Sequence, residues 1–223
     1  RLGGVGWIVG SALVAVLSGA GAAQASERPW EIKKSDHFII YFHEASPDAL
    51  DRLIAHAEAY YDQLTEQLGF TRFDAFWTWD QRAKIYLYGT RDDYQRLTGQ
   101  PQWSEAGAKV REREIHTYVN MAGFFETILP HELGHVIFRE FIGSQRRLPL
   151  WLDEGIACFL EERTKAGRLA SARAIVRTAR FRPLEALTQV RQETLTDPEA
   201  FYAEAASVIE FLFRSYGRER FVE

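Results

Sequence analysis

The sequence predicts an α+β fold, with a small sheet in the N-terminal part of the chain and a helical C-terminal half. Two short runs rich in β-branched and aromatic residues, 37–43 (HFIIYFH) and 84–88 (KIYLY), are typical of strands. From Thr127 onward apolar residues recur at helical spacing, and no further strand pattern follows. Strands with interposed helices, followed by helices alone, indicate a small sheet beside a helical half.

The first part of the chain also carries helix signals. Pro47 opens a long amphipathic pattern that is expected to run to about Leu68 and to end at Gly69. Its apolar residues recur at helical spacing: Leu50, Leu53, Ile54, Ala57, Tyr60, Tyr61 and Leu64. A short helix is expected at 90–97, with Thr90 as its N-cap, and a third strand at 115–119.

The second half is expected to hold helices only. Their predicted spans are 127–142, 150–163, 171–180 and 198–216. Gly143 and Gly217 follow the first and the last of these spans, where glycine commonly ends a helix. Pro130 is tolerated in a first helical turn, so the first of these helices should begin near 127–129.

Composition and charge narrow the class of protein. The chain has 223 residues, 46% of them hydrophobic, which favours one domain with one core. The net charge is −4 and no basic block is present, so a nucleic-acid-binding role is not indicated. The only cysteine, Cys158, lies in an apolar stretch, which favours a buried inert thiol over a nucleophile.

The first 25 residues form a segment of their own. An uncharged apolar run at 2–17 is followed by small residues that end in AQA at 23–25, which fits a signal-peptidase site. We therefore expect a signal peptide at 1–25 and a folded domain at 26–223, in a secreted, periplasmic or cell-envelope protein. The alternative is an uncleaved anchor that associates with a membrane. The chain stops just after a helix, which a cut before the natural C-terminus would also produce.

Residues 131–135 read HELGH, which is an HExxH motif. Histidines four residues apart project from one helix face, about one turn apart, so His131 and His135 can bind one ion. Glu132 lies about 100° around the helix from His131 and can approach a metal-bound water without binding the metal. Apolar neighbours would bury this helix, and a metal would satisfy polar groups that are costly inside a protein.

A third ligand candidate, Glu154, is separated from His135 by 18 intervening residues. Glu154 lies in the segment WLDEGIA, which is expected to form a second helix packed against the first. Two histidines and one glutamate leave a fourth position for water, which is the layout of a catalytic rather than a structural zinc site. Gly155, next to this candidate, is consistent with a close approach between helices, or with ordinary packing.

The pair HELGH and WLDEGIA at this separation resembles the gluzincin metallopeptidases. ILPHELGHVI, and later YAEAASVIEFLFRSYG, are similar to the bacterial peptidase-MA-like branch of that group, and the resemblance covers about 38–216. It implies a zincin-like metalloprotease domain that holds Zn²⁺ through His131, His135 and Glu154. It also implies that Glu132 is the general base, activating a zinc-bound water that hydrolyses a peptide or protein substrate.

Three further residues have less specific signals. Gluzincins commonly place a Tyr or His against the developing oxyanion, and Tyr202 is the candidate because it opens the helix expected to close the cleft. A core or capping tyrosine is the equal alternative. Asp153 and Glu161 could orient the ligand histidines, but for Glu161 we expect a solvated carboxylate beside Glu162.

The function we expect first is that of an endopeptidase. An aminopeptidase is an alternative, but its G-x-M-E-N type segment is not matched by 118–123 (YVNMAG). A non-catalytic, zinc-stabilised envelope binding domain is the other alternative. Glu132 argues against it, because a purely structural site has no use for that carboxylate.

Overall fold

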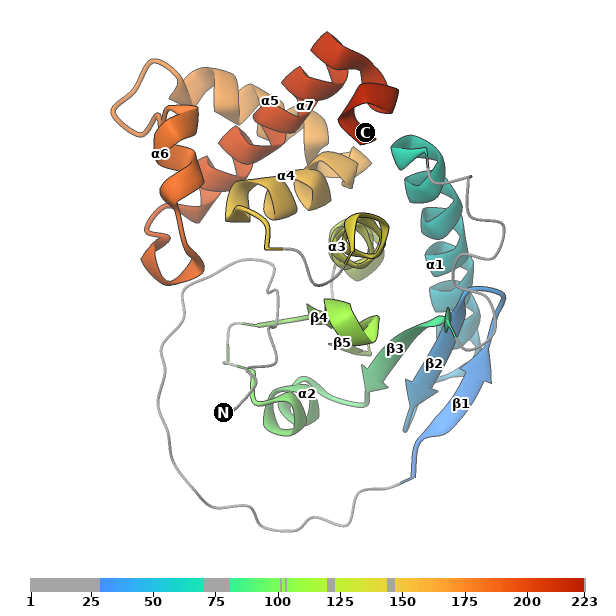
Figure 1. Cartoon of the computed structure of the whole chain (residues 1–223). Helices are drawn as coiled ribbons and strands as arrows, with labels where there is room; N and C mark the ends of the chain where they lie inside the picture. The colour runs from blue at the N-terminus through green and yellow to red at the C-terminus, as the bar shows by residue number, and fades with distance from the viewer. Residues whose placement is uncertain are drawn as a thin grey trace.

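The computed structural model describes residues 29–69, 81–100, 102, 104–119, 123–143 and 147–222. The predicted signal segment at 1–25 lies outside the described residues, as do residues 120–122 of the segment compared with aminopeptidases. The described chain is α+β, with a small mixed sheet in its N-terminal part and helices in its C-terminal half (Figure 1). The predicted fold class is confirmed at this level.

The sheet has five strands in the order β1-β2-β3-β5-β4. They are β1 (Glu31–Lys34), β2 (Phe38–Phe42), β3 (Ala83–Tyr88), β4 (Gly107–Lys109) and β5 (Glu114–Tyr118). The three central strands are parallel, and β1 and β4 pair antiparallel at the two edges. The sequence predicted these three central strands, whereas their parallel pairing comes from the structure. It missed both edge strands, because β1 is largely exposed and β4 is a three-residue Gly-Ala-Lys segment, so neither shows a clear alternation.

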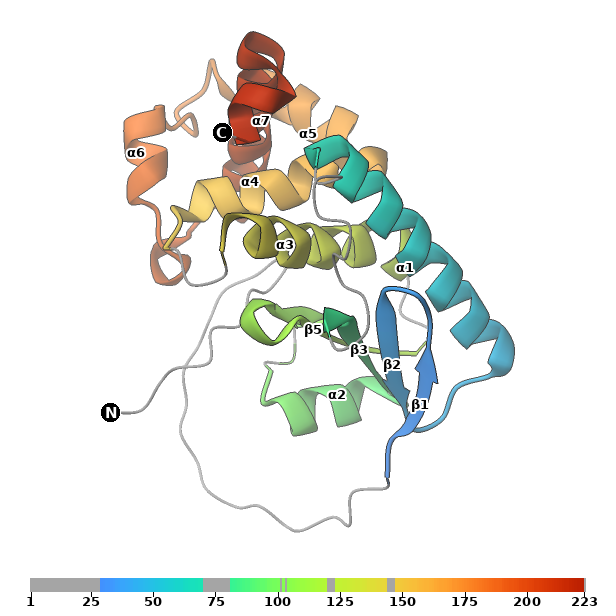
Figure 2. The same ribbon diagram turned by 45° about the vertical axis from the view of Figure 1, so that its right-hand side comes forward.

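One face of the sheet packs against helices α1 (Pro47–Leu68) and α3 (Leu129–Ile142). Ile40, Ile85 and Ile115 from the three parallel strands are fully buried and share one core with Leu133 and Val136 of α3. Helix α2 (Arg91–Thr98) lies on the other side of the sheet, as Figure 2 shows. The layers therefore follow the order α2, sheet, α3, with the helices that follow α3 in the chain lying beyond it and α1 alongside the sheet and α3.

Local capping explains why α1 and α2 begin and end where the sequence predicts. The Ser46 hydroxyl accepts a hydrogen bond from the Ala49 N–H at the start of α1, and Gly69 ends the helix with φ 76°. Thr90 caps α2 in the same way, accepting from Asp93 N–H. Glycine adopts the left-handed backbone conformation without steric strain. Gly69 and Gly99 have this conformation and end the two helices.

The helical half contains five α-helices and a π-helical turn within its described residues. They are the π-turn η3 (Phe124–Ile128), then α3, α4 (Leu150–Leu160), α5 (Glu162–Ile175), α6 (Leu184–Gln189) and α7 (Pro198–Val222). Pro130 lies at the start of α3, as expected, and the chain before it is wound as the π-turn. Figure 1 shows α4, α5 and α7 stacked on the side of α3 away from the sheet.

Two helix predictions are wrong. The helix expected at 150–163 stops at Leu160, because Glu161 leaves the helical region with ψ 81°, and a new helix starts at Glu162. The helix expected at 171–180 is the second half of α5, which ends at Ile175. Helix α7 leaves helical geometry at Gly217, as predicted, but resumes beyond it. Within the described residues, no helix combines the length and the apolar character needed to cross a membrane.

Candidate metal centre

The two histidines of the HELGH segment converge on one point inside the protein. Both lie on α3 and are buried, with His135 fully inaccessible and His131 6% exposed. Their Nε2 atoms are 3.1 Å apart, and the two rings are nearly perpendicular. One neutral imidazole can donate to the other across this gap, whereas with the protons on both Nδ1 atoms the two Nε2 lone pairs can bind one cation.

Glu154 reaches the same point from α4. Its Oε2 atom lies 3.5 Å from His131 Nε2 and 3.6 Å from His135 Nε2. Two close helix contacts hold α4 in this place. A Cβ on Gly134 would lie 3.3 Å from Ala157 Cα on α4, and a Cβ on Gly155 would lie 2.8 Å from the Ala205 carbonyl oxygen on α7. Glycine at both positions lets three helices pack closely around the site.

The spacing of these three ligand atoms fits a divalent metal ion. Two ligands at the usual zinc distances of about 2.0–2.1 Å and at a tetrahedral angle are about 3.3 Å from each other. The three separations of 3.1, 3.5 and 3.6 Å lie around this value. Two imidazoles and one carboxylate are ligands that suit zinc well. The structure therefore brings together the three residues that the sequence predicts as ligands.

The hydrogen bonding of the buried carboxylates also fits a cation-binding site. Both carboxylate oxygens of Glu154 are buried and accept no hydrogen bond from the described residues. A buried carboxylate that accepts no hydrogen bond is unfavourable, and coordination of an ion would satisfy it. Among the described residues, no arginine pairs with Glu132 or Glu154, unlike the other two buried carboxylates of the site, Asp153 and Glu161.

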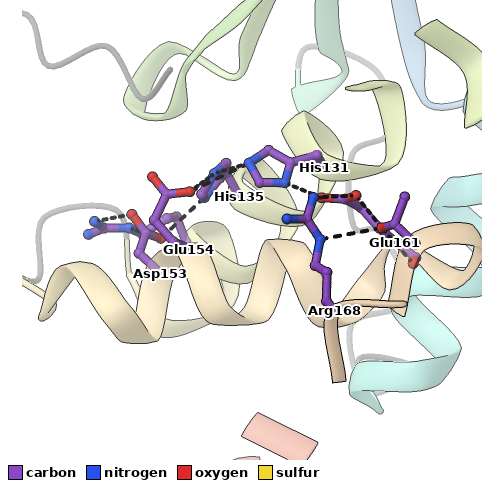
Figure 3. A network of polar contacts seen from close by, with 8 residues as sticks. His131, His135, Asp153, Glu154, Glu161 and Arg168 are labelled. Atoms are coloured by element: carbon purple, nitrogen blue, oxygen red, sulfur yellow. Dashed lines mark hydrogen bonds and ion pairs between the residues drawn. The ribbon is translucent and has the colours of Figure 1, made fainter. Parts of the chain in front are cut away.

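Glu161 contacts Nδ1 of His131, the ring nitrogen that does not face His135 and Glu154. The Nδ1 atom of His131 lies 2.6 Å from Glu161 Oε1, as Figure 3 shows. Thr164 donates its hydroxyl hydrogen to Glu161 Oε2 at 2.6 Å, and Arg168 Nη2 donates to both carboxylate oxygens at 2.9 and 3.1 Å. Glu161 is 1% exposed, so the expectation of a solvated carboxylate is wrong. The break between α4 and α5 at this residue places it inside the molecule.

Asp153 faces His135 in the way that Glu161 faces His131. Its Oδ1 atom lies 3.5 Å from His135 Nδ1, and Arg139 donates to both of its oxygens at 2.9 and 2.7 Å. The Arg139 and His135 charges hold the pKa of Asp153 at about 2, although burial opposes this. Each ligand histidine therefore faces an ionised carboxylate that an arginine holds in turn; His131 is hydrogen-bonded to Glu161, whereas His135 and Asp153 form an ion-pair contact without a hydrogen bond. Such partners fix the ring orientation of a metal-binding histidine.

Glu132 is the carboxylate without a fixed partner. It is 1% exposed, and its Oε2 atom has no hydrogen bond among the described residues. Burial raises the pKa of Glu132 to about 7, against the opposing effect of the two histidines. A carboxylate with a pKa near neutrality is suited to accept and return a proton.

The carboxylates make the site attractive to cations. Burial alone disfavours a charged imidazole, but Glu154 and Asp153 outweigh it and raise the pKa of His135 to about 9. The pKa of His131 is also raised well above its ordinary value, against its burial, by Cys158, Glu154 and Glu161. A metal ion bound at Nε2 would compete with these protons.

A second group of three ligand atoms shares His131. Cys158 Sγ, Glu161 and His131 place one ligand atom each within 4.8 Å of one another, and all three residues are buried. Glu161 is already saturated by Thr164 and Arg168, and the positive Arg168 disfavours a cation there. Burial raises the pKa of the Cys158 thiol, which agrees with the predicted inert role. The group that contains Glu154 is therefore the better metal site.

Tyr202 lies in the first turns of α7 and is 4% exposed. It lines a cavity of about 260 Å³ together with His131 and Cys158. The Arg168 guanidinium carbon is 6.0 Å from the centre of its ring. The tyrosine is thus beside the candidate metal ligands, and its role towards an oxyanion stays a prediction.

Arg139 and Arg168 are the functional residues that the sequence analysis missed. Each comes at helical spacing after a residue that was singled out: Arg139 is four residues after His135, and Arg168 is seven after Glu161. An arginine one or two turns after a candidate site residue was the available signal. This spacing is also common in surface helices, so only the buried positions of the paired carboxylates distinguish these two arginines.

No protein-family model matches this chain, and no significant relative is found among curated proteins. The functional assignment therefore depends on the chemistry of the residues described above.

Proposed function

We propose that this chain is a zinc-dependent metallopeptidase of the gluzincin type, with a zincin-like domain. One observation carries the proposal: His131, His135 and Glu154 converge at metal-ligand spacing. Glu132 is buried, and its Oε2 atom accepts no hydrogen bond from the described residues, which leaves this atom able to act on a water. This combination suits a catalytic site better than a structural one, in which every polar group would be occupied.

Each residue has a defined task in the proposed reaction. His131, His135 and Glu154 would hold the ion, which when bound supplies Lewis acidity at the substrate carbonyl and acidifies water. Glu132 accepts a proton as water attacks the scissile carbonyl, and it then returns a proton to the leaving amine. Glu161 and Asp153 keep the histidine rings in the orientation that presents Nε2 to the ion. Tyr202 is the candidate donor to the oxyanion.

The sheet offers a reason for a peptide substrate. β4 is an antiparallel edge strand that pairs with β5 alone among the described strands, and α3 contacts it. An extended peptide can add to such an edge through main-chain hydrogen bonds, with its scissile bond then close to α3. Because an edge strand reads the backbone and needs no chain terminus, this arrangement favours an endopeptidase.

The test is a comparison of three proteins reconstituted with zinc: the wild type, Glu132→Gln and His135→Ala. We expect one zinc ion per chain in the wild type and in Glu132→Gln, and much less in His135→Ala. Only the wild type should cleave an internally quenched peptide library. Full turnover by Glu132→Gln would exclude its role as base, and zinc-loaded wild type without any cleavage would leave a structural metal site.

A further inference from the structure

The cavity beside the candidate metal centre has its own polar chemistry. Its volume is about 260 Å³, slightly below the ~300–1,000 Å³ of typical small-molecule sites. It therefore has the size for one side chain rather than for a cofactor. Its wall is formed by side chains from α3, α4, α5 and α7, from the turn before α3 and from the break between α4 and α5: Thr127, Ile128, His131, Cys158, Glu161, Thr164, Arg168 and Tyr202.

The cavity is next to the proposed reaction centre because His131 belongs to both. The Nε2 atom of His131 faces His135 and Glu154, whereas its Nδ1 atom faces Glu161, as Figure 3 shows. A substrate whose carbonyl lies at the metal would thus have the cavity within reach of a neighbouring residue.

Arg168 is the cation in the wall of this cavity, and part of its guanidinium is unused. Its Nη2 atom donates to both oxygens of Glu161, and its Nε atom donates to the Thr164 hydroxyl at 3.4 Å. Its Nη1 atom makes no hydrogen bond with the described residues, and the side chain is 27% exposed. The guanidinium group is therefore held by Glu161 through Nη2, and the N–H groups of Nη1 remain available as donors.

We propose that this cavity is a specificity pocket that binds a carboxylate of the substrate through Arg168. The carboxylate is either the side chain of an Asp or Glu adjacent to the scissile bond or the C-terminal carboxylate of a short substrate. This inference rests on the proposed peptidase function for the nature of the ligand.

The chemistry favours a carboxylate over a neutral side chain. Hydrogen bonds between guanidinium and carboxylate are about twice as strong as those between neutral groups. Glu161 lines the same cavity, and its negative charge opposes a second carboxylate. Its oxygens are held by His131, Thr164 and Arg168 Nη2, however, and so leave the Arg168 Nη1 donors to the ligand. The cavity is also partly enclosed by Tyr202, Ile128 and Cys158, which weakens competition from water.

The experiment measures binding first, so that its result does not depend on turnover. The full chain carrying Glu132→Gln and loaded with zinc is titrated in a calorimeter with an acetylated, amidated hexapeptide that contains one glutamate. The same peptide with glutamine in that position is the reference. We expect the glutamate peptide to bind at least about tenfold more tightly. Equal binding of the two peptides would overturn the proposal.

Variants of α5 separate the proposed role of Arg168 from a structural one. Adding Arg168→Gln should remove the preference for glutamate, and Arg168→Lys should retain part of it. Arg173→Gln is the matched control, because Arg173 is exposed on the same helix and does not line this cavity. A preference that survives Arg168→Gln would assign it to another residue and overturn the proposal.

Two more arms identify the source of the carboxylate and separate this inference from the proposed function. An alanine hexapeptide with a free C-terminus that binds more tightly than its amide would assign the pocket to a substrate C-terminus. If it does not, the glutamate preference assigns the pocket to a side chain. Cleavage by the wild-type enzyme without any carboxylate preference would refute the pocket alone. Carboxylate-selective binding without cleavage by the wild type would refute the peptidase and retain the pocket.

Discussion

A Cβ atom on Gly155 would lie 2.8 Å from the carbonyl oxygen of Ala205. That neighbour is backbone of α7, not a flexible side chain, so the contact could be relieved only by moving one helix away from the other. Gly155 directly follows Glu154, the candidate ligand on α4. The packing of α4 against α7 therefore determines where the third ligand of the proposed metal site can be.

Replacement of Gly155 by alanine should destabilise the protein by about 1–3 kcal/mol through overpacking. The same displacement of α4 should weaken metal binding at Glu154. Urea denaturation measures the first effect, and competition with a chromophoric chelator measures the second. Gly167→Ala on α5 is the control, since a Cβ there meets nothing within 4 Å. It should stabilise the helix by about 0.5–1 kcal/mol, and equal losses in both variants would contradict the argument.

Glu161→Gln should lower metal affinity about 10–100-fold, the usual effect of losing the partner of a ligand histidine. Glutamine keeps the size of the side chain but loses the charge that faces His131 and Arg168. The neighbouring Glu162→Gln is the matched control, because Glu162 is exposed and pairs only with surface groups such as Lys165. Metal titration of both variants checks the prediction, and similar affinities would rule out the role of Glu161.

Removal of the metal should lower the melting temperature. Without an ion, Glu132 and Glu154 remain buried, and Glu132 Oε2 and both Glu154 oxygens accept no hydrogen bond from the described residues. An ion present at 1,000 times its dissociation constant would add about 4.1 kcal/mol to stability. Thermal melts with and without a chelator measure the shift. The chelator should have little effect on His135→Ala, and an equal shift in that variant would point to a different metal site.

Stability should fall in acid through Glu114 on the outer face of the sheet. Despite its burial, His116 and Lys84 hold the pKa of Glu114 at about 2, below its ordinary value of 4.5. Because the folded pKa is depressed, this contribution is present above pH 4.5 and is lost as the pH falls towards 2. It amounts to at most about 3 kcal/mol. Glu114→Gln should flatten the stability curve between these pH values, and an unchanged slope would refute the assignment.

The sequence alone determined those features that depend on near neighbours in the chain. The N-caps at Ser46 and Thr90 and the glycine stops at Gly69 and Gly99 act within one helical turn, so α1 and α2 begin and end where local signals indicate. The common face of His131 and His135 follows from helix geometry in the same way. Glu154 could be named because its segment resembles a known pattern, not because of its spacing alone.

Only the tertiary structure decided which charged residues are buried and what they contact. Glu161 and Glu162 are adjacent in the sequence and look alike, yet Glu161 is 1% exposed and contacts His131, 30 residues earlier. Arg139 and Arg168 complete the site for the same reason, since each opposes a carboxylate from another helix or another turn. A buried charge is stable only when its partner is in place, and that partner comes from distant parts of the chain. Local sequence patterns do not predict which distant residues pair, so these ion pairs are known only from the packing of the helices.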